Sequence, residues 1–434
     1  MDSFYLLSAH TVNAMAALPA EISAHTNPFP RLPSQGAFYT AGMQFSNGAV
    51  VLPFICAHLG LTWLAALLFP AYGLGSIVGN SMSPAVLRRV GQMRHLLLAA
   101  MAASAAALIL CDAMIRWNGM LAAAVFLLTS AGGGVIVAVA NVAYPDTTSG
   151  KLSALRMLSV QGAIASVVAT VAALFLVPGL ATGDKLALHR DLLCLGAFGL
   201  AASGFAALFV GPARSDSIAP RMSVRDTWRR GFGVARTQPW FRRYVITCLL
   251  FAPLSLGMTF YALRTAHQSG TLHVLVFLST IGLVIGSALW RKVYQLFGVR
   301  GMLLGSALLS AAAGVLSIAA EACGQWFHMW AYGTVFLLAT VAALAVFAAA
   351  ISWVGVVAAE PHRVTLIGFC STLLAIETTA LGGALGGIAQ NHSKIWPVAI
   401  VVVLAAAAAV AALGAPGPAR AATGHAPNGG VPTI

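Results

Sequence analysis

The sequence predicts an all-α polytopic membrane protein with twelve transmembrane helices in two pseudo-symmetric six-helix bundles. Three observations indicate this class: an apolar composition, a regular series of apolar segments, and a pattern that occurs twice. Hydrophobic residues make up 59% of the 434 residues and charged residues only 8%, against about a quarter in soluble domains. Such a chain cannot cover its surface with polar side chains, so lipid must be the solvent for most of it.

Twelve apolar segments have lengths close to the roughly 20 residues that a helix needs to cross a bilayer. They lie between a predicted cytoplasmic arm at 1–36 and a Gly/Pro/Ala-rich tail at 415–434, which we expect to be disordered. The first bundle (37–211) contains 37–59, 62–82, 95–114, 118–142, 157–178 and 191–211. The second bundle (244–414) contains 244–263, 272–290, 301–320, 327–350, 364–389 and 395–414.

A glycine-containing stretch occurs in both halves, 207 positions apart. Small residues four apart give one face of a helix a smooth surface, which favours close packing against a neighbouring helix. A basic turn follows the glycines in each copy, and the single offset indicates a duplicated unit, as in transporters built from parallel repeats. The glycines pair as Gly75 with Gly282, Gly79 with Gly286, and Gly91 with Gly298.

The basic residues alternate between the two sides of the predicted membrane. With both termini inside, 19 of the 24 lysines and arginines fall in inner segments and five in outer segments. An excess of Lys and Arg marks cytoplasmic loops, so we expect both termini in the cytoplasm and an even number of spans. The alanine-rich composition favours a bacterial inner (plasma) membrane.

The polar connection at 212–243 separates the two bundles. It carries eight arginines together with Trp228, Trp240 and Phe241, which predicts an amphipathic helix on the anionic inner leaflet. No recognised nucleic-acid-binding fold surrounds it, so we expect lipid rather than nucleic acid as its partner. The six cysteines are scattered without metal-ligand spacing, and no ATP-binding motif is present, so we expect no metal or other cofactor.

Six helices, a basic connection, six further helices and a Gly-plus-basic turn in each half resemble the major facilitator superfamily over about residues 37–414. The resemblance implies a secondary transporter whose two bundles rock about a midplane site. The family's turn motif is Gly-x-Leu-x-Asp-Arg-x-Gly-Arg-Arg, and Arg89 and Gly91 match it, but Arg88 replaces the acid. The family's inner charge pairing therefore cannot form in its usual way. We expect Asp146, in an inner loop, to pair with Arg88 or Arg89 instead.

Glu377 is the candidate for a functional ionisable residue within the membrane, because it lies in the middle of an apolar segment. An ionised carboxylate facing lipid is expensive, so Glu377 must face a cavity, find a partner or stay protonated. One hypothesis is a coupling residue that loads and releases a proton as access alternates. The other is a protonated glutamate that is hydrogen-bonded within the bundle. Asp112, four residues before Arg116 at the end of a segment, is expected to form a surface ion pair.

The resemblance also implies that helices one, four, seven and ten line the substrate cavity. Polar side chains there either contact substrate or form hydrogen bonds between helices, and both interpretations stay open. The candidates are Gln44, Asn47, His58, Asn141, Thr259, Tyr261, Arg264 and Tyr332.

We therefore expect a secondary active transporter of a small molecule, proton-coupled through Glu377, with export favoured over uptake and a monomeric state. The few charges in the spans favour a neutral, amphipathic or cationic substrate over a polyanion. The alternatives are an uptake symporter or facilitator of the same fold and a non-transporting receptor or scaffold. A membrane enzyme is disfavoured, because no paired carboxylates, His cluster or nucleophile with a base are visible.

Overall fold

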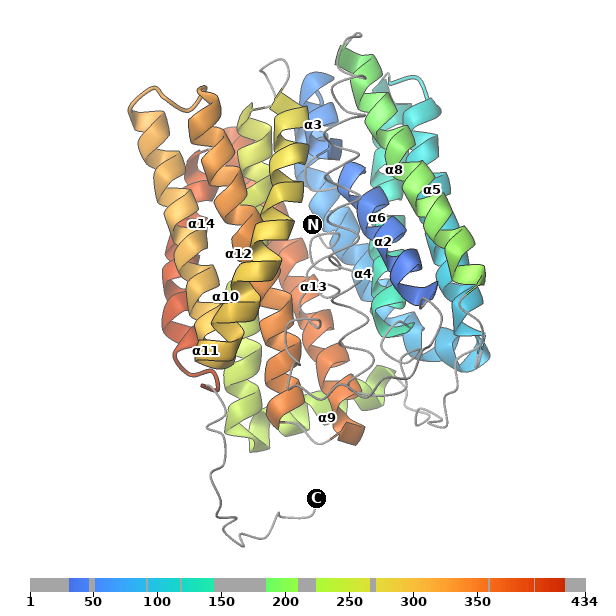
Figure 1. The fold of residues 1–434 in the computed structure, drawn as a ribbon, viewed down its shortest axis with the longest axis vertical. Coiled ribbons are helices and arrows are strands. Elements are labelled where there is room, and N and C mark those ends of the chain that lie inside the picture. The colour runs from blue at the N-terminus through green and yellow to red at the C-terminus, as the bar shows by residue number, and fades with distance from the viewer. Residues whose placement is uncertain are drawn as a thin grey trace, which may run out of the picture.

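The computed structural model describes residues 31–46, 51–90, 93–117, 119–143, 185–209, 224–265, 271–357, 360–393 and 395–417. Every regular element in these ranges is a helix (Figure 1), which confirms the all-α class. The helices are α2 (Arg31–Phe45), α3 (Val51–His58), α4 (Thr62–Val90), α5 (Arg94–Met114), α6 (Gly119–Ala143), α8 (Lys185–Leu208), α9 (Val224–Thr237), α10 (Pro239–Thr265), α11 (Thr271–Ala322), α12 (Met329–Val357), α13 (Glu360–Asn391) and α14 (Ile395–Ala412).

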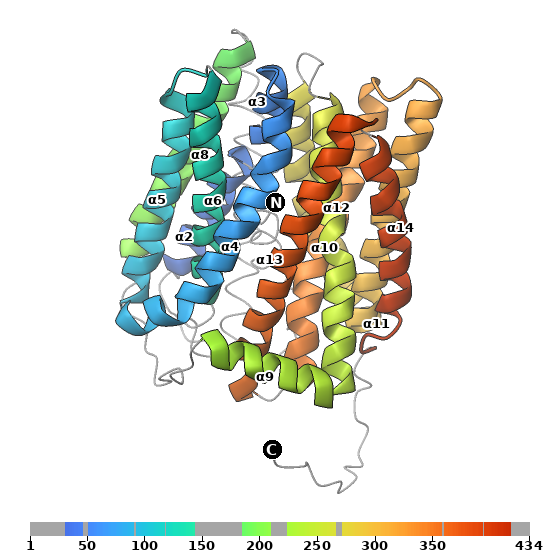
Figure 2. The ribbon, with the colours of Figure 1, turned by 180° about the vertical axis from the view of Figure 1, so that it is seen from behind.

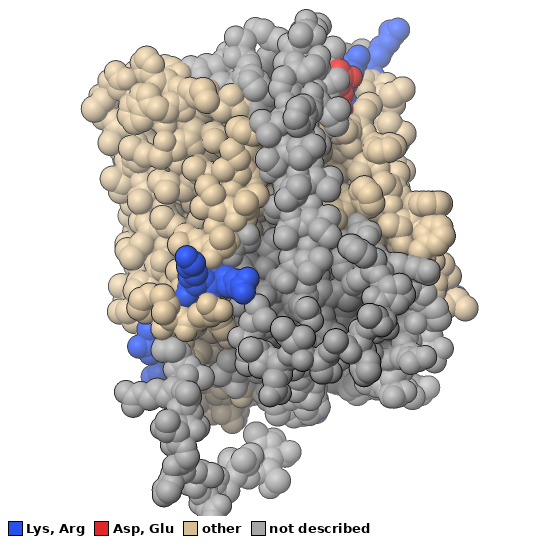
Figure 3. Space-filling model, viewed as in Figure 1, with Lys and Arg blue, Asp and Glu red and all other residues tan. Residues whose placement is uncertain are grey.

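The long helices stand side by side in two groups, α2 to α8 in one and α10 to α14 in the other (Figures 1 and 2). In the described part of the chain, nine helices are long and apolar enough to cross a membrane. The predicted segment 37–59 is divided between α2 and α3, and segment 157–178 lies outside the described residues. On one face, a broad uncharged band of described side chains separates charged groups nearer the two ends (Figure 3).

Helix α11 contains two of the predicted spans, 272–290 and 301–320. Gly298 interrupts it with φ 64° and ψ −157°, a conformation that is open to glycine and strained for other residues. The basic turn that follows Gly298 is bonded to the segment just after α14. Arg300 donates from its backbone N to Pro416 O at 3.1 Å and from Nε to Ala415 O at 3.0 Å. The turn thus joins two antiparallel spans of the second bundle.

The repeated glycines lie at equivalent helix crossings in the two bundles. A Cβ at Gly75 would lie 1.9 Å from the carbonyl oxygen of Ala131 on α6, and one at Gly79 would lie 2.7 Å from that of Val135. In the second bundle, Gly282 and Gly286 of α11 face Thr340 and Leu344 of α12 at 2.5 and 2.4 Å. Glycine therefore lets the backbones approach closely at both crossings.

Helix α9, in the basic connection, lies across one end of the molecule (Figure 2), named here the α9 end. The opposite, far end is where α11 passes into α12. Trp228 and Phe232 of α9 pack on Phe369 of α13, with ring centroids 5.3 and 5.1 Å apart, and Arg225, Arg229, Arg230 and Arg236 are exposed. The predicted amphipathic helix is present, with its aromatic side chains on the second bundle.

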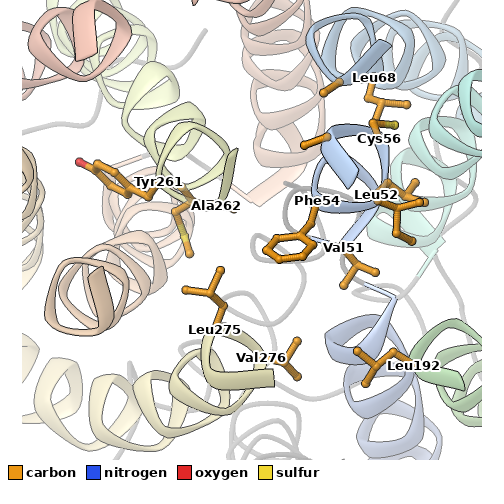
Figure 4. Close-up of a cluster of buried hydrophobic side chains, with 14 of the residues drawn as sticks. Val51, Leu52, Phe54, Cys56, Leu68, Leu192, Tyr261, Ala262, Leu275 and Val276 are labelled. Carbon is orange, nitrogen blue, oxygen red and sulfur yellow. The ribbon is translucent and has the colours of Figure 1, made fainter. Parts of the chain in front are cut away.

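The buried side chains form a shared core toward the far end and separate cores toward the α9 end. In the shared core, Val51 and Phe54 of α3 belong to the same cluster as Leu275 and Val276 of α11; Figure 4 shows Phe54 pointing from α3 toward Leu275. At the α9 end, the second bundle has a cluster around Trp290, and the first has a smaller one around Leu98. Among the described residues, the buried cluster shared by the two bundles therefore lies toward one end.

Adjacent glycines of α6 offer a matched test of close helix packing. A Cβ at Gly134 would lie 2.1 Å from the carbonyl oxygen of Tyr72 on α4, whereas one at Gly133 meets only the Tyr72 ring, at 4.0 Å. We expect Gly134→Ala to destabilise the protein by ~1–3 kcal/mol through overpacking. Gly133→Ala should be neutral or slightly stabilising, because alanine favours helix. Thermal unfolding of the purified protein, followed by tryptophan fluorescence, compares the two, and equal effects would contradict the packing.

Candidate functional site

The two bundles meet along α4 and α13. A Cβ at Gly73 of α4 would lie 1.8 Å from Oγ1 of Thr379 on α13, and one at Gly382 would lie 3.0 Å from the Cβ of Phe69. These contacts lie in the halves of α4 and α13 nearer the far end, and the two helices separate toward the α9 end (Figures 1 and 2). We call this crossing the bundle joint.

A cavity of about 280 Å³ adjoins the joint, between α4, α10 and α13. Its wall is mostly apolar, and the missing side chains of two glycines on α13 leave room in it. Three polar side chains, those of Thr259, Gln390 and His392, reach the lining. A mostly apolar wall with a few polar groups is typical of small-molecule sites. The lining residues are Ala65, Phe69, Leu256, Thr259, Phe260, Leu263, Gly382, Gly386, Ala389, Gln390 and His392.

Glu377 lies on α13, two residues before Thr379 of the joint. It is partly buried, and its Oε2 is buried without a hydrogen-bond partner among the described residues. It is close enough to the Cys248 thiol of α10 for an electrostatic interaction, so it lies near a helix of its own bundle. The neighbouring hydroxyls are occupied, since Thr378 and Thr379 donate to the carbonyls of Leu374 and Ala375 at 2.8 and 2.6 Å. A carboxyl group that lies here without a cationic partner in the described ranges is suited to carrying a proton.

Arg264, a cavity candidate at the far end of α10, is engaged within its own bundle. It is 7% exposed, and its guanidinium donates to Ser317 Oγ and to a carboxylate oxygen of Glu321, both on α11. The same guanidinium lies 3.9 Å from the ring centroid of Trp326, an arrangement that favours the cation. These contacts hold α10 against α11 and leave the charge of Arg264 compensated.

The other cavity candidates divide into those that the structure places and those that it does not. Thr259 lines the cavity, Tyr261 is buried beside the Trp326 ring, and Tyr332 is buried in the shared core. Asn47, Gly91 and Asp146 lie outside the described residues, as does any pairing of Asp146 with the turn arginines. The side chains of Gln44, His58, Arg88 and Asn141 are likewise not described, and that of Arg89 is exposed.

The expected surface ion pair between Asp112 and Arg116 is wrong. Asp112 is 0% exposed, and its Oδ1 accepts a hydrogen bond of 2.9 Å from the Thr129 hydroxyl on α6. Helix α5 ends at Met114, so exposed Arg116 lies beyond the helix and loses the spacing that would bring the two side chains together. The buried acid, like the contacts of Arg264 with α11, depends on helix orientation, which a single sequence does not reveal.

No family model matches the chain. Solved structures of transporters share its fold. A mutant of the nucleoside transporter NupG has a TM-score of 0.62 and 13% identity, and the match covers 93% of this chain and 99% of that one. The partially occluded, inward-open xylose transporter XylE of E. coli has a TM-score of 0.59 and 11% identity, and the match covers 94% of this chain and 97% of that one. The E. coli fucose:proton symporter FucP is similar as well, with a TM-score of 0.56 and 16% identity over 88% of this chain and 97% of that one. This is the fold of the major facilitator superfamily, and the protein is an integral membrane protein.

Two curated relatives have much higher identity. The uncharacterized protein Rv2209 of Mycobacterium tuberculosis and the uncharacterized protein Mb2232 of Mycobacterium bovis are each 59% identical to this chain over 404 residues. The match covers 92% of this chain and 79% of each relative. The chain belongs to the family of these mycobacterial proteins.

The contacts of Arg264 predict a structural role that a double-mutant cycle can measure. Glu321→Gln leaves a buried guanidinium without its counterion, which we expect to cost ~1–2 kcal/mol, because Glu321 itself is 45% exposed. Arg264→Gln in the same background should restore part of that loss. Urea unfolding gives the coupling free energy, and Arg291→Gln, at an exposed site on α11, is the control. Additive effects of the Arg264 and Glu321 changes would contradict the ion pair.

Proposed function

We propose that the protein is a secondary active transporter that moves a small molecule across the membrane by alternating access. The observation that carries this proposal is the asymmetry of its core. The two bundles share buried side chains at the far end, whereas each has its own cluster at the α9 end. Two rigid bodies joined at one end can rock about that joint, which exposes a site between them to one side at a time.

The proposed orientation places the α9 end, and both termini, in the cytoplasm of a bacterial cell. The exposed arginines of α9 support it, because basic segments next to membranes gather on the cytoplasmic face. In this orientation the core shared by the two bundles lies on the outer side, and transport requires the joint between α4 and α13 to open. The protein functions as a monomer, since each chain holds both bundles.

The substrate class follows from the cavity at the joint. Its lining is mainly apolar, with one hydroxyl, one amide and one imidazole as polar groups. Such a wall suits a small neutral, amphipathic or cationic molecule, and its described lining contains none of the arginines that a polyanion would require. Three of the fold-level neighbours are described as transporters of nucleosides, xylose and fucose, which are themselves small and uncharged, and another is a bacterial homologue of an iron transporter.

Coupling to protons runs through Glu377. It lies near the joint, and its buried Oε2 has no partner among the described residues. Ionising such a group within the bilayer is costly unless water or a cation reaches it. Opening the joint changes the water access of Glu377, so its protonation state and the direction in which the cavity opens are linked. Export is the favoured direction, and proton antiport would drive it.

An uptake symporter or facilitator of the same fold would use the same cavity, with the proton and the substrate moving together. A non-transporting receptor or scaffold is the remaining alternative. The receptor or scaffold alternative is favoured by Arg88, which occupies the acidic position of the turn motif, because the charge pairing of the family's gate cannot form there in its usual way. Exchange of labelled ligand in proteoliposomes separates a transporter from a scaffold.

Glu377→Gln tests proton coupling once a ligand is found by thermal-shift screening of sugars, nucleosides and organic cations, because a bound ligand raises the unfolding temperature. In proteoliposomes, we expect the variant to keep counterflow exchange of the labelled ligand and to lose accumulation driven by a pH gradient at least tenfold. Equal loss of both activities would contradict the coupling role.

Thr378→Val is the matched control, because the hydrogen bonds of the Thr378 hydroxyl, one residue away, go to carbonyls of its own helix in the described part of the chain. This variant should retain both exchange and pH-driven accumulation. If it lost accumulation as Glu377→Gln does, the effect would belong to the packing of α13 rather than to the proton.

A further inference from the structure

The first bundle contains a buried acid for which the proposed function has no role. Asp112 of α5 is 0% exposed, and its Oδ2 has no hydrogen-bond partner among the described residues. Within the described ranges, the one side chain that bonds the carboxylate is Thr129 of α6, at 2.9 Å from Oδ1. One polar neighbour is too little to stabilise a carboxylate ion in a protein interior within a membrane.

No cation in the described part of the chain neutralises this acid. Helix α8 contributes Arg190, but its guanidinium lies 4.9 Å from the centroid of the Trp117 ring and donates to the Ile115 carbonyl oxygen at 3.5 Å. His189 of the same helix packs its ring on Phe54. Asp191 of α8 is partly buried and carries the wrong sign.

Two further titratable neighbours, a thiol and a phenol, carry no positive charge. Helix α3 contributes the buried Cys56 thiol, which is close enough to Asp112 for an electrostatic interaction, and α4 contributes the Tyr72 phenol to the nearby cavity. Arg116, beyond the end of α5, is exposed. The surroundings of Asp112 therefore favour the neutral carboxylic acid.

Thr129 lies between this acid and a small cavity. The cavity has a volume of about 60 Å³ and a mostly apolar wall, to which Ser46, Tyr72, Thr129 and Ser130 add polar residues. A space of this size can hold a water where polar groups are present to bond it. Thr129 thus lines the cavity and also donates its hydroxyl to the carboxyl group.

The Thr129 hydroxyl also has a second acceptor, the Leu108 carbonyl oxygen at 3.5 Å. When Asp112 is ionised, the hydroxyl donates to Oδ1. When Asp112 is protonated, Oδ1–H donates to Thr129 Oγ1, and the hydroxyl turns toward Leu108. The site can therefore hold either state of the acid by rotating one hydroxyl group.

We propose that Asp112 is a second protonation site, which exchanges its proton with water in the N-terminal bundle through the Thr129 hydroxyl. On protonation, a hydronium ion in the cavity gives a proton to Thr129 Oγ1, while the proton of Thr129 passes to Asp112 Oδ1. Water remains in the cavity, and the carboxylate becomes a carboxylic acid. Release reverses both transfers, so no other reactant is needed.

The position of Phe69 links this site to the bundle joint. Phe69 lines both the 60 Å³ cavity and the 280 Å³ cavity, and its Cβ faces Gly382 of α13. Opening the joint moves Phe69 and changes the water that reaches Thr129. Asp112 would then complement Glu377, with one acid in each bundle. This inference rests on the proposed proton-coupled transport, but its test does not.

Infrared spectroscopy of the full-length protein in proteoliposomes detects a protonated carboxyl group by its C=O stretching band. At neutral pH we expect the spectrum of Asp112→Asn to lack one such band. The same band should be present in the spectrum of Glu377→Gln. In deuterated water the band should shift to lower frequency as its proton exchanges through the cavity. Asp226→Asn is the control, because Asp226 is exposed on α9 and should contribute no band.

Thr129→Val keeps Asp112 and removes its hydrogen-bond partner, so it should move the same band to higher frequency and slow its exchange. This variant gives the answer even if Asp112→Asn fails to fold. The proposal is overturned if Asp112→Asn leaves the carboxyl region unchanged, or if Thr129→Val does not move the band. If Asp112→Asn removed a band but Glu377→Gln removed none, the proposed protonation of Glu377 would be contradicted and the proposal for Asp112 would stand.

Discussion

The close approach of Gly73 to Thr379 is the contact on which the rest of the arrangement depends. Helices in lipid gain little from hydrophobic attraction to one another, so they associate where small residues let their backbones approach. A Cβ at Gly73 would lie 1.8 Å from the Thr379 hydroxyl oxygen and 3.2 Å from the Ala375 carbonyl oxygen, so a larger residue would force α13 or the Thr379 side chain to shift. The joint sets how the two bundles meet, places the 280 Å³ cavity between them, and brings Phe69 and Glu377 near the same crossing.

The charged groups inside the bundles fall into two kinds, and their partners distinguish them. Arg264 is bonded to Ser317 and Glu321 and lies over Trp326, so its charge is compensated in place. Glu377 and Asp112 each keep one buried carboxyl oxygen without a partner among the described residues. A compensated charge stabilises one conformation, whereas an uncompensated acid responds to the water that each conformation admits. The second kind is what coupling to protons requires.

The sequence predicts the parts of this structure that depend on local pattern. Span lengths follow from apolar composition, the helix crossings of both halves follow from glycines four apart, and α9 follows from its arginines and aromatic residues. Contacts between distant segments are not visible in one sequence: Arg264 meets Glu321 across 57 positions, and Thr129 meets Asp112 across 17. Asp112 was misassigned because the end of α5 at Met114 decides whether Arg116 can reach it.

Alternating access as proposed requires the two bundles to rock as rigid bodies about the α4–α13 joint. The most direct test is a pair of spin-label distances in lipid nanodiscs, in a background with the six native cysteines replaced. One pair, at Met120 and Met329, spans the far end, and the other, at Arg89 and Arg291, spans the α9 end; all four positions are exposed. The account predicts two populations for each pair, with one distance lengthening as the other shortens when the pH changes. One unchanged distance at each end, at every pH, would contradict it.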